Sequence, residues 1–99
     1  MSRKWRVEDN LVTLYIALHK NKDLNYKKKD IEKIIALAAV QMRIGNFIFI
    51  ATNGKSGLSA GGPAQSWKQL YNIFKDFDQK KFAKLVNLIL EVKSNLINN

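Results

Sequence analysis

The chain contains no cysteine, one proline and one histidine among its 99 residues. The absence of cysteine excludes disulfide frameworks, thiolate zinc sites and cysteine nucleophiles. Because His19 is the only imidazole, chemistry that needs two histidines, such as a ββα-metal nuclease centre, is excluded as well. No apolar run approaches the length of a membrane span, and residues 1–6 do not read as a signal peptide. We therefore expect a small, soluble, cytoplasmic domain.

Positive charge is what the chain has in excess. Lys and Arg total 17 against 8 Asp and Glu, which gives a formal net charge of +9. The bases are spread along the chain, with local concentrations at Arg3, Lys4 and Arg6 and at Lys27-Lys28-Lys29. A positive field favours polyanions, because each phosphate that a protein neutralises releases a condensed counterion. The alternative is a surface that is lysine-rich only for solubility.

Hydrophobic periodicity predicts helices throughout. Leu11, Leu14, Tyr15 and Leu18 share the i, i+3, i+4, i+7 spacing of one helical face. Similar patterns continue along the chain, and Gly61-Gly62-Pro63 marks the clearest loop. With 46% hydrophobic residues, the 99 residues suffice for one domain, residues 1–99. We predict an all-α, compact bundle of about five helices, at about 8–19, 26–38, 40–51, 66–74 and 79–97.

Helix boundaries are predicted from capping residues. Asn25 is the expected N-cap of the second helix, Ser66 with Gln69 forms a candidate capping box for the fourth, and Asp78 caps the fifth. The segment 26–50 has two interpretations, because Ala36-Leu37-Ala38-Ala39 could also continue a single unbroken helix. The apolar end of that segment, residues 47–50, would alone also suit a buried strand.

Two short motifs resemble catalytic signatures and are rejected. Gly54-Lys55-Ser56 resembles part of a phosphate-binding loop, but Phe49 stands where that loop needs its first glycine. Glu91-Val92-Lys93 has the spacing of a PD-(D/E)xK nuclease motif, whose carboxylates converge from adjacent strands, whereas here it falls in an amphipathic helix. No other grouping suggests a catalytic, metal or cofactor site. We predict that the chain is not an enzyme.

The segments 26–38 and 40–51 together suggest a helix-turn-helix-like core. The second of them carries Gln41, Arg43 and Asn46. Gln and Asn can pair bidentately with adenine and Arg with guanine, so these are candidate base-reading residues. Lys27–Lys29, together with Arg3, Lys4 and Arg6, are the candidate phosphate contacts. The join lacks the glycine that such turns often contain.

A resemblance to a known family rests on four quoted stretches. They are Glu8-Asp9-Asn10-Leu11-x-x-Leu14-Tyr15, Ile31-x-x-Ile34, Val40-x-Met42-Arg43-Ile44-x-Asn46-Phe47, and Gly57-Leu58-Ser59 followed by Trp67. Over about residues 5–78 they resemble a small helical module found beside HNH nuclease domains in restriction endonuclease-like proteins, and also alone. The resemblance implies a DNA-recognition domain with Arg43 and Asn46 at the matching polar positions. It does not imply cleavage, since the nuclease half is missing.

The functional expectation is a non-catalytic domain that binds double-stranded DNA, as a specificity or regulatory protein associated with restriction or a mobile element. Two of its residues keep a second interpretation: Asn46 as a brace for the loop that follows it, and Arg43 as a salt-bridging surface residue. The alternative function is a small helical protein-interaction module or dimerising inhibitor. The surplus of apolar residues in the helix at 79–97 favours it, because such a surface suits a homodimer or a nuclease partner.

Overall fold

The computed structural model describes residues 4–59 and 65–98, residues 97 and 98 by their backbone alone. These residues form helices and no strand. The helices are α1 (Val7–His19), α2 (Lys28–Ile35), α3 (Val40–Ala51), α4 (Gln65–Phe74) and α5 (Gln79–Asn98). The all-α prediction is therefore confirmed. The candidate turn at residues 61–63 and Arg3 lie outside the described residues.

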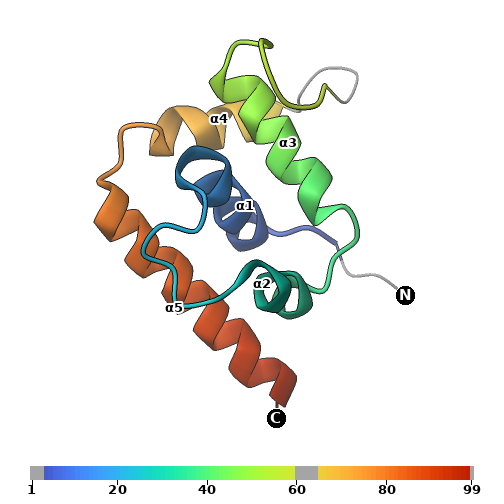
Figure 1. Cartoon of the computed structure of the whole chain (residues 1–99), viewed down its shortest axis with the longest axis vertical. Helices are drawn as coiled ribbons and strands as arrows, with labels where there is room; N and C mark the ends of the chain where they lie inside the picture. The colour runs from blue at the N-terminus through green and yellow to red at the C-terminus, as the bar shows by residue number, and fades with distance from the viewer. Residues whose placement is uncertain (1–3, 60–64, 99) are drawn as a thin grey trace.

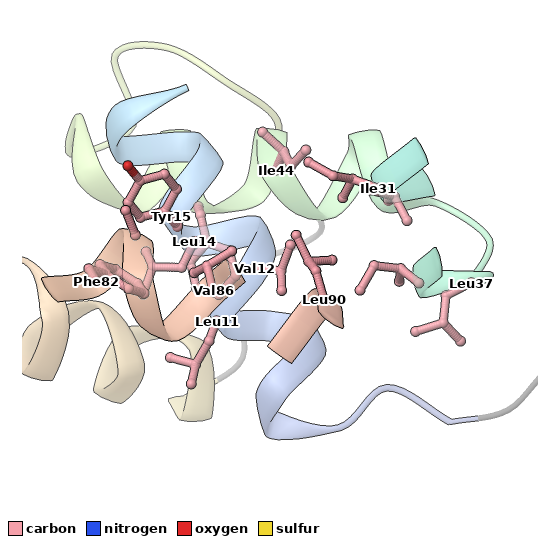
Figure 2. Packing of buried hydrophobic residues seen from close by; sticks show 14 residues of the cluster. Leu11, Val12, Leu14, Tyr15, Ile31, Leu37, Ile44, Phe82, Val86 and Leu90 are labelled. Carbon is pink, nitrogen blue, oxygen red and sulfur yellow. The ribbon is translucent and has the colours of Figure 1, made fainter. Parts of the chain in front are cut away.

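Helix α1 occupies the centre of the molecule, between α3 on one side and α5 on the other (Figure 1). Five consecutive residues of α1, 11–15, are buried, so this helix is enclosed on more than the single face that its spacing predicts. Figure 2 shows side chains of α1 meeting those of α5, with Ile31 of α2 and Ile44 of α3 beside them. The Cα radius of gyration is 13.0 Å, as expected for one compact domain of this length.

Polar side chains anchor α1 to α5 at both ends of their contact. Asp9 is fully buried, and its carboxylate accepts a hydrogen bond from the backbone N–H of Arg6 at 2.9 Å and lies 3.1 Å from the ammonium of Lys93. At the other end, the Tyr15 hydroxyl donates to the Lys22 carbonyl and accepts from the Gln79 amide at 2.7 Å. These contacts satisfy groups whose burial without a partner would be costly.

The capping predictions have mixed outcomes. Asp78 is the N-cap of α5, because its carboxylate accepts from the Lys81 backbone N–H at 2.9 Å. Asn25 is not a helix cap: its backbone N–H donates to the side chain of Asn87, and α2 begins later, after Lys27. Ser66 is not the start of α4 either, since that helix already includes Gln65.

The segment 26–50 contains two helices. Ala36 and Ala39 both adopt left-handed conformations, with φ of 54° and 65°, and they end α2 and precede α3. The axes of the two helices are bent by 106° across this four-residue break, and Leu37 inside the break is buried. Helix α3 spans the predicted residues 40–51, so the strand interpretation of 47–50 is wrong. Ala38, predicted to end the second helix, lies in the turn.

Within the described parts of the chain, no single helix has the length and apolar composition to cross a membrane. Helices α2 and α3 meet that criterion only when taken together, as the bent pair.

Candidate nucleic-acid interface

A hollow of about 300 Å³ lies where the C-terminal end of α1 meets α2 and the first turns of α3. Its floor is aliphatic and its rim is polar. The polar lining comprises Lys20 and Asn21, which follow α1, Lys28 and Glu32 of α2, and Gln41 from the first turn of α3. Two predicted contact residues, Lys28 and Gln41, are thus brought to one site, and Lys20 joins them although the sequence pattern did not single it out.

Two lysines of the segment 20–33, Lys20 and Lys28, line this hollow, and the segment carries four more. Residues 20–33 contain six lysines against three acidic residues, and all six lysine side chains are exposed. Two of the acids accept hydrogen bonds from neutral amides and keep their negative charge: Asp23 accepts from Gln79 at 3.0 Å, and Glu32 accepts from Gln41 at 2.7 Å. We refer to Lys20, Lys22, Lys27, Lys28, Lys29 and Lys33 as the lysine rim. It is an exposed concentration of positive charge that is only partly balanced locally.

The start of α2 adds to this positive potential. Lys27 is its N-cap and makes no side-chain capping bond, so the first backbone N–H groups of the helix point outward without that partner. The N-terminal end of a helix carries partial positive charge and favours anions. Lys27, Lys28 and Lys29 stand at this end together with one acid, Asp30, so the net side-chain charge has the same sign as that of the helix end.

Gln41 is exposed at the first turn of α3, together with Met42, which is 55% exposed. The Gln41 amide nitrogen donates to the Glu32 carboxylate, which holds the side chain over the α2–α3 turn. This first turn of α3 is open to a ligand. Further along, residues 44–47 are buried.

Arg43 does not lie on this surface. Its guanidinium is stacked between two indole rings, 4.2 Å from the ring centre of Trp5 and 4.1 Å from that of Trp67. It also donates a hydrogen bond to the side-chain oxygen of Asn10. Burial in this setting lowers the pKa of Arg43 below its ordinary value. Arg43 therefore joins the N-terminal segment, α1 and α4, and its donors are not directed toward the lysine rim.

Asn46 is also directed inward. It is 5% exposed, and its amide nitrogen donates to the Leu58 carbonyl at 2.8 Å, while the Leu58 N–H donates to the Gly45 carbonyl at 3.0 Å. This agrees with the interpretation of Asn46 as a brace for the loop after it. Residues 57 and 58 cover α3 at Gly45, where a Cβ atom would lie 3.0 Å from the Leu58 side chain. A helix face closed in this way is not available to bases.

The N-terminal candidates lie at a different place. Lys4 and Arg6 are exposed, and Arg6 lines a separate hollow with Trp5, Ser66 and Gln69. They are not part of the α1–α2–α3 hollow. The predicted set therefore separates into a lysine rim with Gln41, an N-terminal segment, and two inward residues.

The remaining candidates for a chemical role are a metal site and the single histidine, His19. In the described ranges there is no group of three or more His, Asp or Glu residues placed to hold a metal ion. His19 has its Nε2 atom buried without a hydrogen-bond partner among those residues, and its ring packs 5.1 Å from that of Tyr15. Burial, and to a lesser extent Lys22, lowers the pKa of His19, so the neutral form is favoured.

Comparison of the chain with protein-family models, with curated proteins and with solved structures gives no match.

Proposed function

We propose that this protein is a non-catalytic domain that binds double-stranded DNA through the lysine rim, with Gln41 facing the groove. The observation that carries the proposal is the convergence of Lys20, Lys28 and Gln41 on one hollow, inside the exposed lysine-rich region 20–33. Phosphate contacts by lysine and by a helix N-terminus provide the sequence-independent part of DNA affinity.

The arrangement of α2 and α3 supports the same function. Two helices that cross at about 90–120° over a turn of three or four residues are typical of helix-turn-helix units, and 106° over four residues lies within that range. In such units the N-terminal residues of the second helix contact base edges. Here those residues are Gln41 and Met42, both exposed. Base reading in this proposal rests on Gln41, and Arg43 and Asn46 have no part in it.

The proposal is tested by replacing Lys27, Lys28 and Lys29 together with glutamine. The matched control replaces three exposed lysines elsewhere, Lys75, Lys80 and Lys81, so that the change in net charge is equal. Binding to a fluorescent duplex is measured by anisotropy across a salt series. Each phosphate contact contributes about 0.9 to the slope of log affinity against log salt, so we expect the slope to fall by up to about 2.7 in the first variant.

The control variant should keep most of the slope. Equal losses in the two variants would show a diffuse charge effect and contradict a defined interface. A wild-type affinity that does not depend on salt would contradict DNA binding itself. A Gln41→Ala variant adds the second half of the test: it should reduce the preference between duplex sequences by about 1–3 kcal/mol while leaving the salt slope unchanged.

A further inference from the structure

The outer face of α5 carries an apolar stripe that the fold leaves uncovered. Leu88, Val92 and Leu96 are spaced four residues apart and are 57%, 51% and 72% exposed. The opposite face of the same helix buries Phe82, Val86 and Leu90 against α1 (Figure 2), so the stripe is surplus to the core. In Figure 1, α5 forms an edge of the molecule, and its C-terminal part extends beyond the other helices. Contiguous exposed apolar surface of this kind marks interaction sites.

Two charged residues flank Leu88 and indicate what covers the stripe. Lys84 precedes Leu88 by four residues, and Glu91 follows it by three. With about 100° of rotation per residue, Lys84 and Glu91 lie within about 20° of each other around the helix, on the same side of Leu88. Both are exposed, and neither forms an ion pair with another described residue.

We propose that α5 pairs with α5 of a second copy of this chain, antiparallel, about a two-fold axis at Leu88. A two-fold axis places residue 88−n of one copy level with residue 88+n of the other. Leu88 then meets its own equivalent. Lys84 of one copy comes within one residue rise, about 1.5 Å along the axis, of the level of Glu91 of the other, on the same edge.

The other edge of the pairing is apolar. Leu85, which is half-buried, is level with residue 91 of the second copy and so lies beside its Val92. Each contact occurs twice because the interface is symmetric, so two Lys84–Glu91 pairs border a central row of aliphatic side chains. A parallel pairing would instead place Lys84 and Glu91 of one copy on the edge opposite to those of the other, so no Lys84–Glu91 pair would form between the copies. Flanking charges of this kind set partner choice and orientation between paired helices.

The self-association goes beyond DNA binding and does not depend on it, because α5 contributes no residue to the lysine rim. The test is the solution mass, by light scattering on a sizing column and by sedimentation velocity across a concentration series. The chain has a mass of 11.4 kDa, so we expect a species of twice that mass. Leu88→Asn should shift it to the single-chain mass. A wild-type protein that remains at 11.4 kDa up to hundreds of micromolar overturns the proposal.

Charge reversal tests the antiparallel register. Lys84→Glu or Glu91→Lys alone converts two attractive contacts into two repulsive ones, and should weaken self-association by about tenfold or more. The double variant Lys84→Glu/Glu91→Lys restores both pairs and should return to wild-type strength. An equimolar mixture of the two single variants should form mixed dimers, since one copy is then acidic and the other basic at these positions.

Lys75→Glu, in the turn that follows α4, is the matched control for the change in net charge and should leave the mass unchanged. Far-UV circular dichroism of each variant confirms the fold. Single reversals that leave the dimer as strong as wild type overturn the antiparallel register, because a parallel pairing predicts that result. A double variant that stays as weak as the single ones overturns the Lys84–Glu91 contact. Neither result affects the lysine-rim experiment, so the two proposals fail separately.

Discussion

Replacing Arg43 with alanine should destabilise the fold and leave the DNA-contacting surface chemically unchanged. The side chain is held by two indole rings and by the Asn10 side chain. Each cation–π contact is worth about 0.5–1 kcal/mol when exposed and about 2 when desolvated. A hydrogen bond from a charged donor adds about 1.5–3 kcal/mol. Because Arg43 remains half-buried and its contacts overlap, we expect a loss of about 2–4 kcal/mol.

The assay is urea and thermal unfolding followed by far-UV circular dichroism. For a domain of this size each kcal/mol corresponds to about 4–8 °C in Tm, so the variant should melt roughly 10–25 °C lower. The only two tryptophans, Trp5 and Trp67, both contact Arg43, so tryptophan fluorescence reports the same site in the folded state. Arg43→Lys should recover only part of the loss, because an ammonium keeps the charge but not the planar stacking.

Gln41→Ala, on the same helix but exposed, is the control and should change stability by no more than about 0.5 kcal/mol. Suppose that Arg43→Ala unfolds at the wild-type urea concentration and yet alters the preference between DNA sequences. The contacts of Arg43 with Trp5, Trp67 and Asn10 would then contribute nothing to the free energy of unfolding. The reasoning about this residue would then be refuted.

Three further outcomes follow from other contacts. Asp9→Asn removes the charge that faces Lys93, which is 15% exposed, and should cost about 3 kcal/mol in urea unfolding; a loss below about 1 kcal/mol contradicts it. Gly57→Ala places a Cβ 2.6 Å from a backbone nitrogen at φ of +86°, so hydrogen exchange of the Leu58 amide should accelerate, and unchanged protection argues against a tightly docked loop. His19 has a lowered pKa when folded, so the unfolded chain binds the proton more readily and the free energy of unfolding should fall as the pH drops below about 6.5. His19→Phe should flatten this dependence between pH 7 and 5.5, and an equal slope in both proteins contradicts it.

Much of the fold was predictable because helices are local. Apolar spacing located α1, α3 and α5 to within a residue or so, and Asp78 acts as the N-cap that its position predicts. The errors arose where a distant contact competes with a local rule. Asn25 has the composition of a cap, but its backbone is bound to Asn87 of α5, so α2 starts later. The break at residues 36–39 depends on the backbone conformations of Ala36 and Ala39, which are left-handed. Sequence patterns rarely predict such a break at alanine, because glycine is the usual residue in that conformation.

The sequence by itself determined the helices, the excess of positive charge and the absence of cysteine chemistry, since these depend on composition and on residues a turn apart. Only the tertiary structure decided which polar residues face the solvent. Arg43 and Asn46 share helix α3 with Gln41, and nothing in their local pattern separates them. Trp5, Trp67 and Leu58 reach α3 from other segments and enclose the first two, while Gln41 stays exposed beside the lysine rim. Packing between distant segments decides which polar residues of a helix are covered. The spacing of residues within that helix does not predict it.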